Sequence, residues 1–435
     1  MKTNIMIIVL SVCFGYSVSF GAQIEIPSSF NPVGSGARAI GRGGAFIAVA
    51  DDATAASWNP GGLAELKKAE ASVVFSGFHR KEDNTFGTNP EANGLSSVSE
   101  SNINYMSATY PFELFNHNMV VSLSYQHLYD FSRDWNFMIK QDSGFQKSED
   151  SWSFQQDGRL SAIGLSYCIR VIPELSLGIT FNFWDNNLSP NHWEQKYRRI
   201  TSGDVPGNRL LSENYMKTET YSFKGFNNNL GILWRINYKF TIGAVLKTPF
   251  KADIEHTKES TDLRTSPSFQ RDDRYEITNE ELKMPMSYGI GFAYNFSDHF
   301  SIAGDIYKTE WNNCLYKTAD GKEVSPFSTS DQTDTSPTYQ IRVGSEYLFI
   351  DEEKDYIIPI RAGIFYDPAP ANKSPDNFYG FSLGMGFTKN DRFSLDIAYQ
   401  YRFGNHIGNS LLPSLDFSQD VSEHTLYVSA VFYKF

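Results

Sequence analysis

The sequence is poor in cysteine and has no long apolar run beyond its N-terminus. It holds three cysteines in 435 residues. Cys13 falls in a predicted leader, so only Cys168 and Cys314 remain, which is too few for a disulfide framework. We expect no disulfide between them, because they lie on separate predicted strands. No later stretch has the roughly 18 consecutive apolar residues of a transmembrane helix.

Basic residues and catalytic motifs are also scarce. Lys and Arg number 38 against 50 Asp and Glu, so the net charge is −12, which argues against a nucleic-acid partner. The patterns H-E-x-x-H and G-x-S-x-G are absent, and no Cys pair has metal spacing. A G-x-G-x-x-A match at residues 34–39 has no strand before it, so dinucleotide binding is excluded. We predict no enzyme activity, metal or cofactor; a barrel hydrolase has no motif to support it.

The N-terminus predicts export. Lys2 precedes an apolar run at residues 5–14, and the small residues Ser19 and Gly21 suit cleavage after Gly21. Residues 1–21 are therefore predicted to be a signal peptide. An exported chain without a membrane helix is either a soluble periplasmic protein or a β-barrel. The strands of a barrel give only a weak hydropathy signal, because apolar and polar residues alternate along them.

Alternation is strong in several segments. Residues 286–296, 379–387 and 393–403 place aromatic and aliphatic residues on one face and mostly small or polar residues on the other. This period of two indicates strands. A soluble β-sandwich would show the same pattern, with the apolar face as its core.

The lengths of the connections decide between these folds. Short turns alternate strictly with long polar segments, the latter including 80–101, 132–152, 188–214 and 254–275. An up-and-down barrel with short periplasmic turns and long external loops has this rhythm. We predict an all-β, antiparallel transmembrane barrel over residues 69–435. Its fourteen strands are expected at 69–79, 102–112, 117–131, 153–170, 174–187, 215–236, 238–253, 276–296, 299–313, 336–349, 356–366, 378–388, 392–404 and 423–435.

Two further features agree with a barrel in the bacterial outer membrane. The chain ends on Phe435, at the end of an alternating strand, and a terminal aromatic resembles the signal that the barrel-insertion machinery reads. Inward positions in such a barrel tolerate charge, because the closed sheet leaves no unpaired edge. The charged residues expected to face the interior are Asp305, Arg342, Glu346, Arg361, Asp396 and Arg402.

Residues 22–68 do not alternate and are rich in small residues. Asp52 and Asn59 suit helix N-cap positions, and Pro60 suits a first helical position. A barrel of this size has a lumen that must be filled or conduct water. We therefore predict an N-terminal plug of short helices inside the barrel.

The segment GARAIGRGGAFIAVADDATAASWNPGGLAEL (residues 36–66) resembles the FadL/TodX family of outer-membrane transporters. Residues 282–311 and 358–370 are similar to strands of that family, and Gly61 departs from its usual alanine. The resemblance implies uptake of long-chain fatty acids or other hydrophobic compounds. It also implies capture in a groove among the outer loops, gating by an N-terminal hatch, and lateral exit beside a kink of the third strand.

Apolar side chains are unusually dense for solvated loops in and beside residues 132–152 and 188–214. They either pack on one another as a loop cap, lie in an interfacial aromatic girdle, or line the groove that the resemblance implies. The residues expected in this outer-loop groove are Trp135, Phe137, Met138, Phe145, Trp152, Phe154, Trp193, Tyr197, Leu210 and Leu211. The hatch residues expected to take part in gating are Gly43, Gly44, Phe46, Asp51, Asp52, Trp58, Asn59 and Pro60.

The expected partners are a hydrophobic small molecule, outer-membrane lipid and lipopolysaccharide, and the insertion machinery, with the barrel acting as a monomer. An alternative function stays open. The same motif resembles FadL-related barrels that serve protein secretion, such as the type IX system, where no small molecule need pass. A general-diffusion porin is disfavoured by the plug-like segment.

Overall fold

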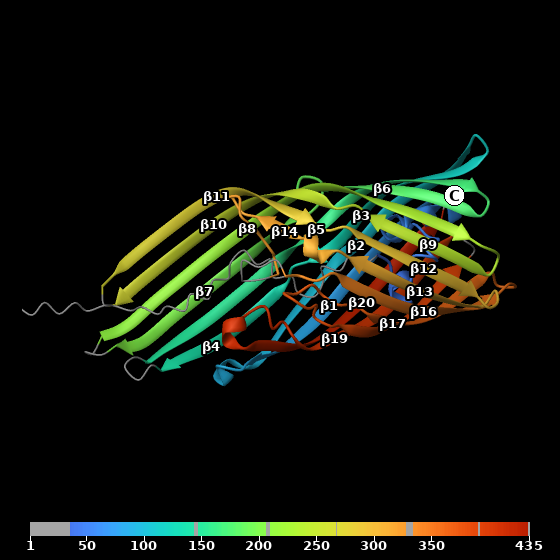
Figure 1. Ribbon diagram of the computed structural model, residues 1–435. Coiled ribbons are helices and arrows are strands. Elements are labelled where there is room, and N and C mark those ends of the chain that lie inside the picture. Colours follow the sequence, from blue (N-terminus) through green and yellow to red (C-terminus); the bar gives the residue numbers. More distant parts are fainter. Residues whose placement is uncertain are drawn as a thin grey trace, which may run out of the picture.

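The chain folds as a closed antiparallel barrel with a long sheet projecting from one end (Figure 1). The computed structural model describes residues 35–142, 147–205, 209–266, 268–327, 334–389 and 392–433. The predicted signal peptide, residues 22–34 of the predicted plug, Phe145 and Phe435 lie outside the described residues.

Fourteen strands pair in a ring, which confirms the predicted number and fold class. The ring closes because the first strand, β1, pairs along its whole length with the last, β20. In ring order the strands are β1 (Glu70–Phe86), β2 (Gly94–Leu114), β3 (His117–Asp130), β5 (Lys147–Ile172), β6 (Leu175–Asp185), β8 (Arg209–Arg235), β9 (Phe240–Lys247), β12 (Ser287–Asn295), β13 (Phe300–Thr309), β16 (Thr338–Asp351), β17 (Tyr356–Tyr366), β18 (Tyr379–Lys389), β19 (Phe393–Ile407) and β20 (Phe417–Tyr433).

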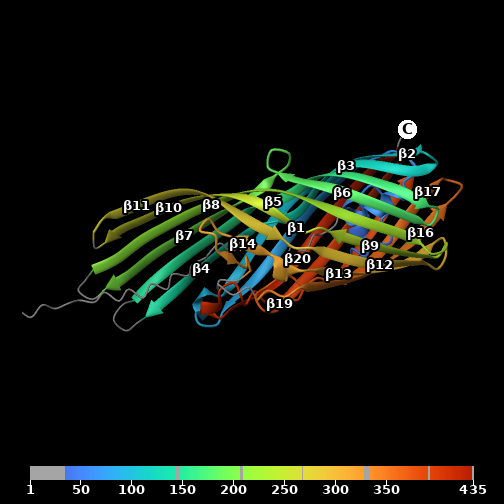
Figure 2. The same cartoon turned by 45° about the horizontal axis from the view of Figure 1, so that its top comes forward.

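The prediction of a long outer loop at 80–101 was wrong, because most of it belongs to strands β1 and β2. The prediction of long outer loops at 132–152, 188–214 and 254–275 was wrong as well. These segments are strands that extend the wall beyond the ring as one curved sheet, in the order β4-β5-β7-β8-β10-β11 (Figure 2). Their outward faces are polar because they meet water, and this polarity was mistaken for loop character. The added strands are β4 (Arg133–Asp142), β7 (Asn191–Val205), β10 (Phe250–Ser266), β11 (Gln270–Met284), β14 (Leu315–Lys317) and β15 (Glu323–Val324).

The predicted alternation of faces is confirmed. Ile290 and Phe292 on β12 and Leu383 on β18 are exposed on the outer surface, by 64%, 48% and 55%. Their neighbours Gly291 and Ser382 face inward and are buried. All six charged residues expected inside are buried, with exposed fractions of 8% or less. The barrel therefore has an apolar outside and a polar inside.

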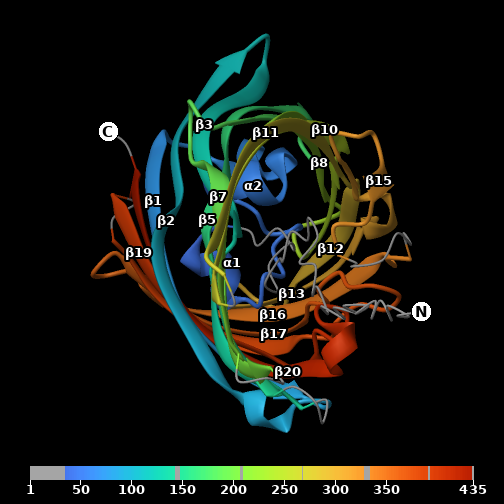
Figure 3. The ribbon, with the colours of Figure 1, turned by 90° about the vertical axis from the view of Figure 1, so that its left-hand side faces the viewer.

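Short helices lie inside the ring of strands (Figure 3). They are α1 (Ala37–Gly41), α2 (Ala55–Trp58) and the 3₁₀ helix η1 (Pro60–Glu65); short 3₁₀ turns elsewhere are η2 (Pro90–Ala92), η3 (Trp311–Asn313) and η4 (Pro413–Leu415). Asn59 caps η1 by accepting a hydrogen bond from the Gly61 N–H, and Pro60 follows it, as predicted. Asp52 is not an N-cap. Thr54 occupies that position of α2, and the Asp52 carboxylate accepts the Thr54 N–H in a local turn.

Among the described residues, no helix has the length and apolarity to cross a membrane. Cys168 and Cys314 are both free and buried.

Candidate functional site

Residues 35–66, called here the inner segment, are held to the wall by hydrogen bonds from many strands. The Asp305 carboxylate on β13 accepts the backbone N–H groups of Phe46 and Ile47, at 2.7 and 3.0 Å. Asn59 donates its amide to the Ile47 and Ile232 carbonyls, at 2.8 and 2.9 Å. Because the segment has little regular structure, Asp305 of the wall and Asn59 of the segment itself satisfy backbone groups that would otherwise be buried without partners.

A buried ionic network lies at the short-turn end of the inner segment. Glu346 on β16 accepts from Arg42 at 3.2 Å and from Arg361 at 2.6 Å, and Arg361 also donates to Asp396. Arg38 lies 3.5 Å from Glu346 and pairs with Asp51. Two barrel strands and the inner segment thus share one carboxylate.

The inner segment touches the wall where the wall has glycine. A Cβ built on Gly344 of β16 would lie 2.0 Å from the Arg42 carbonyl oxygen, and one built on Gly363 of β17 would lie 2.2 Å from the Gly43 nitrogen. Gly43 and Gly44 themselves have positive φ values of 67° and 75°, which favour glycine. A side chain at these wall positions would displace backbone.

We therefore expect Gly344→Ala to destabilise the seated inner segment by about 1–3 kcal/mol through overpacking. Gly77→Ala on β1 is the matched control, because the nearest atom to its added Cβ lies at 3.6 Å. Limited proteolysis of folded barrels in detergent measures the effect as faster cleavage within residues 35–66. Equal cleavage of the two variants would contradict the close approach at Gly344.

Five of the predicted groove residues come together in the projecting sheet. Trp135 and Phe137 on β4, Trp152 and Phe154 on β5, and Tyr197 on β7 share one apolar cluster, called here the outer aromatic cluster. Phe137 stacks on Trp152 with ring centroids 5.8 Å apart, and Trp152 meets Tyr197 edge-on at 5.5 Å. Its other buried members are Phe86, Ala92, Ile139, Leu412 and Phe417.

The remaining predicted groove residues do not join this cluster. Met138 lies on the opposite face of β4 and is 42% exposed. Trp193 belongs to a deeper cluster, in which it stacks on Tyr221 at 4.7 Å. Leu210 and Leu211 lie on β8, but their side chains, like Phe145, are outside the described part of the structure.

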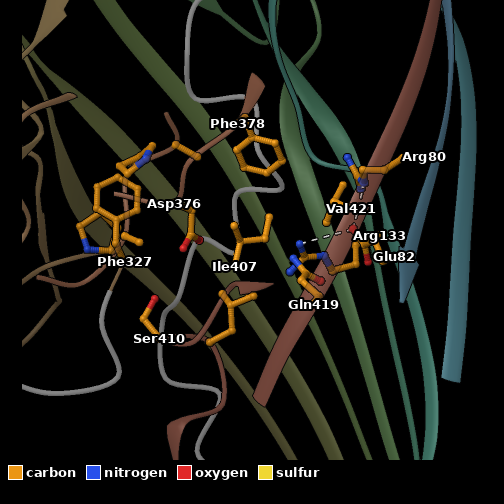
Figure 4. Close-up of a pocket in the computed structure, with 15 residues that line it drawn as sticks. Arg80, Glu82, Arg133, Phe327, Asp376, Phe378, Ile407, Ser410, Gln419 and Val421 are labelled. Carbon is orange, nitrogen blue, oxygen red and sulfur yellow. Dashed lines mark hydrogen bonds and ion pairs between the residues drawn. The ribbon is translucent and has the colours of Figure 1, made fainter. Parts of the chain in front are cut away.

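A small cavity adjoins the outer aromatic cluster and joins a charged wall to an apolar one (Figure 4). We call it the arginine pocket. Arg80 on β1 donates to Glu82 at 2.9 Å, and Arg133 on β4 lies 3.6 Å from the same carboxylate. The Arg133 guanidinium stacks over the Trp135 ring at 4.2 Å, and the Trp135 indole N–H donates to Glu82. The apolar lining includes Phe327, Phe378, Ile407, Leu411 and Val421.

A second cavity lies deeper in the barrel, between Tyr129, Trp184 and Trp311. Asn182, Asn227 and Asn229 line its other side. The free volumes are only about 40 Å³ in the arginine pocket and about 30 Å³ here. A bound small molecule needs a site of roughly 300 Å³ or more. Both cavities are therefore closed to a substrate in this structure. A larger space, of about 420 Å³, lies at the short-turn end between the inner segment and the wall, and its lining includes Arg38, Asp51, Tyr238 and Glu346.

The wall has an interrupted ladder between β2 and β3. Their pairing ends at Tyr105 opposite Gln126, while β2 continues to pair with β1 as far as Gly94. Just above, the register of β3 with β5 shifts between His127 and Tyr129. Tyr105, the last paired residue, is fully buried and donates its hydroxyl to the Ala53 carbonyl of the inner segment at 2.7 Å.

A histidine between two carboxylates ties the projecting sheet together. Nδ1 of His256 on β10 is 3.1 Å from Glu280 on β11, and Nε2 is 3.5 Å from Glu219 on β8. Neighbouring outward residues of β10 are charged and exposed, so this part of the strand lies outside any apolar layer. Burial lowers the pKa of His256, but the two carboxylates outweigh it and raise the pKa to about 9. Burial raises the pKa of Glu219, but His256 and Lys217 outweigh it and lower the pKa to about 2.

These shifts predict a pH dependence of the sheet. The stabilisation from His256 is fully present below the unfolded pKa of about 6.5 and is lost as pH rises through about 9. After allowance for solvent screening it is worth about 1–2 kcal/mol. We expect wild type to unfold at a higher temperature than His256→Gln at pH 6. The difference in unfolding temperature should shrink by pH 10. Tryptophan fluorescence follows the unfolding in both cases. A difference that grows with pH would contradict this assignment.

Groups of three or more His, Cys, Asp or Glu side chains that could hold a metal ion are absent from the described ranges. Sequence reasoning missed the arginine pocket. Arg80, Glu82 and Asp376 lie in segments of ordinary polar appearance, and nothing in their spacing shows that β1, β4 and the β17–β18 connection meet. Trp135 next to Arg133 was the available signal, because an indole beside a guanidinium suits a stacked pair.

Comparison with solved structures shows the same fold. The CymD monoaromatic hydrocarbon channel superimposes with a TM-score of 0.56 at 16% identity, over 93% of this chain and 99% of that one. A FadL homologue of Pseudomonas aeruginosa gives 0.60 at 14% identity, over 92% and 98%. The toluene transporter TodX of Pseudomonas putida gives 0.57 at 12% identity, over 93% and 99%. No curated protein matches the sequence.

The family model described as outer membrane protein transport protein (OMPP1/FadL/TodX) matches residues 22–411, nearly the whole chain. The closed barrel, its apolar outer surface and the inner segment agree with that match. The chain belongs to this family of outer-membrane transporters of hydrophobic compounds.

Proposed function

We propose that this barrel takes up amphiphilic molecules with an anionic head and an apolar tail, of which long-chain fatty acids are the simplest. The outer aromatic cluster first captures the tail. The arginine pocket then receives the head, the inner segment (part of a hatch over residues 22–68) gates the lumen, and the molecule leaves sideways between β2 and β3.

The arginine pocket is the observation that carries this proposal. Arg80 and Arg133 are 2% and 4% exposed, and the rest of the lining is mainly apolar, with Asp376, Ser410 and Gln419 among its polar members. A hydrocarbon would gain nothing from two buried guanidinium groups, whereas a carboxylate accepts their charge-assisted hydrogen bonds. The monoaromatic hydrocarbon channel and toluene transporters that share the fold are named for apolar compounds, so this chain would differ from them in its preferred substrate.

The gating step is supported by the small volumes of the arginine pocket and of the cavity beside Trp311. Both are too small for a substrate, so side chains or the inner segment must shift before a molecule reaches the larger space at the short-turn end. Ala53 accepts from Tyr105, the residue at which the β2–β3 ladder ends. Movement of the inner segment would therefore change the Tyr105 contact at the interrupted ladder. We place the lateral exit into lipid there for this reason.

Secretion of proteins is the alternative function. The family match favours transport of small molecules over docking of a protein partner. The discriminating experiment compares a deletion strain with its parent for uptake of radiolabelled oleate and of toluene, and for secreted protein. Loss of oleate uptake with normal secretion supports the proposal. Normal uptake with failed secretion would defeat it.

A further inference from the structure

A groove on the outer wall of the barrel lies on strands far from the β2–β3 interruption. It has a volume of about 740 Å³ and is lined by β9, β12, β13 and β16. In the ring order these strands face the side opposite to β2 and β3. The proposed transport path therefore does not use it.

The groove is built from three aligned rows of outward residues on β12, β13 and β16. Tyr288, Lys308 and Tyr339 stand directly opposite one another in the first row. Ile290, Ile306 and Ile341 form the second, with exposed fractions of 64%, 60% and 48%. The third row is Phe292, Gly304 and Val343.

Gly304 makes the floor of the groove. A Cβ there would lie 2.8 Å from the Phe292 ring, so the ring lies over the glycine instead of standing away from the wall. The three isoleucines next to it project as a flat aliphatic strip. Such a strip fits extended acyl chains, because covering apolar surface is favourable.

The first row supplies charge at one end of this strip. The Lys308 ammonium lies 5.9 Å from the Tyr288 ring centroid and 5.3 Å from that of Tyr339. It also pairs with Glu310 at 2.7 Å, and the Tyr288 hydroxyl donates to the same carboxylate at 3.0 Å. The hydroxyls of Tyr288 and Tyr339 are also hydrogen-bond partners of Lys308. An anion would replace one of these neutral oxygens, because a charged acceptor binds an ammonium more strongly.

The position of the first row along the barrel indicates which leaflet of the membrane it meets. β13 starts at the short turn after β12 and reaches Lys308 near its far end. Short turns of such barrels face the periplasm, so the row lies toward the cell exterior. The outer leaflet there consists of lipopolysaccharide, whose lipid anchor combines phosphates with several acyl chains.

We infer that this groove is a binding site for one lipopolysaccharide molecule. Its acyl chains lie on the isoleucine strip and against the Phe292 ring, and one phosphate accepts a hydrogen bond from Lys308. The inference goes beyond the proposed function, because it concerns the lipid face and does not depend on what the barrel transports.

The test uses full-length barrel in nanodiscs and fluorescent diphosphoryl lipid A as the probe. Lys308→Met should weaken binding about 10- to 100-fold, the worth of a hydrogen bond to a charged group. Gly304→Leu should also weaken it, because the added side chain displaces the Phe292 ring from the floor of the groove while leaving Lys308 in place. Lys224→Met is the matched control, since Lys224 also pairs with a carboxylate, Asp185 at 3.0 Å, but away from the groove. Its binding should equal that of wild type.

The second part of the test changes the lipid and keeps the protein as wild type. Dephosphorylated lipid A should bind wild type as weakly as diphosphoryl lipid A binds Lys308→Met. Heat-modifiable migration on gels shows that each variant is a folded barrel. Unchanged binding by Lys308→Met, equal binding of phosphatidylethanolamine and lipid A, or a dimer of wild type that occludes the groove would each overturn the inference.

Discussion

Replacing Glu346 by alanine should release the inner segment from the barrel wall. Arg42 and Arg361 donate to this one carboxylate, and all three side chains are almost fully buried. Removing a shared partner leaves buried charge uncompensated, which costs about 3–5 kcal/mol. Amides near Arg42 should therefore lose about two to three orders of magnitude of protection against hydrogen exchange. Mass spectrometry on the folded barrel measures this.

Two further variants separate charge from shape in this network. Glu346→Gln keeps the volume but not the charge, so it should also lose protection. Glu352→Ala, in an exposed turn at the same end of the barrel, should behave as wild type. Unchanged exchange in Glu346→Ala would show that the wall glycines and Asp305 hold the segment without the ionic network.

The second large effect is expected at Arg133. Replacing it by methionine keeps an apolar stem against Trp135 but removes the donors that face the arginine pocket. Uptake of oleate should require about 10- to 100-fold more substrate for half-maximal rate, since hydrogen bonds to charged groups are worth about 1.5–3 kcal/mol. Uptake of toluene, which has no anionic head, should stay within about twofold of wild type. Initial-rate uptake in a deletion strain measures both.

Arg274→Met is the control for loss of a positive charge on the extracellular side. Arg274 is 76% exposed and pairs with its neighbour Asp272, so its replacement should change the uptake of neither oleate nor toluene. If Arg133→Met slowed oleate and toluene equally, the residue would support the outer aromatic cluster and not select the head group.

The wall of the barrel was predictable because its physics is local. A strand shows alternate residues to lipid and lumen, so the faces of β12, β18 and β19 follow from a period of two. The strand count follows from the alternation of short and long connections. The projecting sheet was not recognised, because charged residues on a water-facing strand resemble those of a loop. Only the pairing of β4 with β5 and of β7 with β8 distinguishes the two.

The candidate site was predictable in part. Trp135, Phe137, Trp152, Phe154 and Tyr197 stood out by their density, and the fold brings them into one cluster. The period of two within β4 separates Met138 from them. Arg80 and Glu423 meet across the β1–β20 closure, at 3.7 Å. They are 343 positions apart, and contacts at that separation leave no mark in a single sequence.

By itself, the sequence determined that the chain is an exported fourteen-stranded barrel with a small-residue segment to fill it, because hydrophobic period, turn spacing and composition are properties of neighbouring residues. Tertiary structure decided which charges share a partner, where the β2–β3 ladder stops, and how three rows of side chains align on the lipid face. These depend on register between strands. A shift of one residue would turn Lys308 and Gly304 into the lumen, and only the complete ring of pairings sets that register.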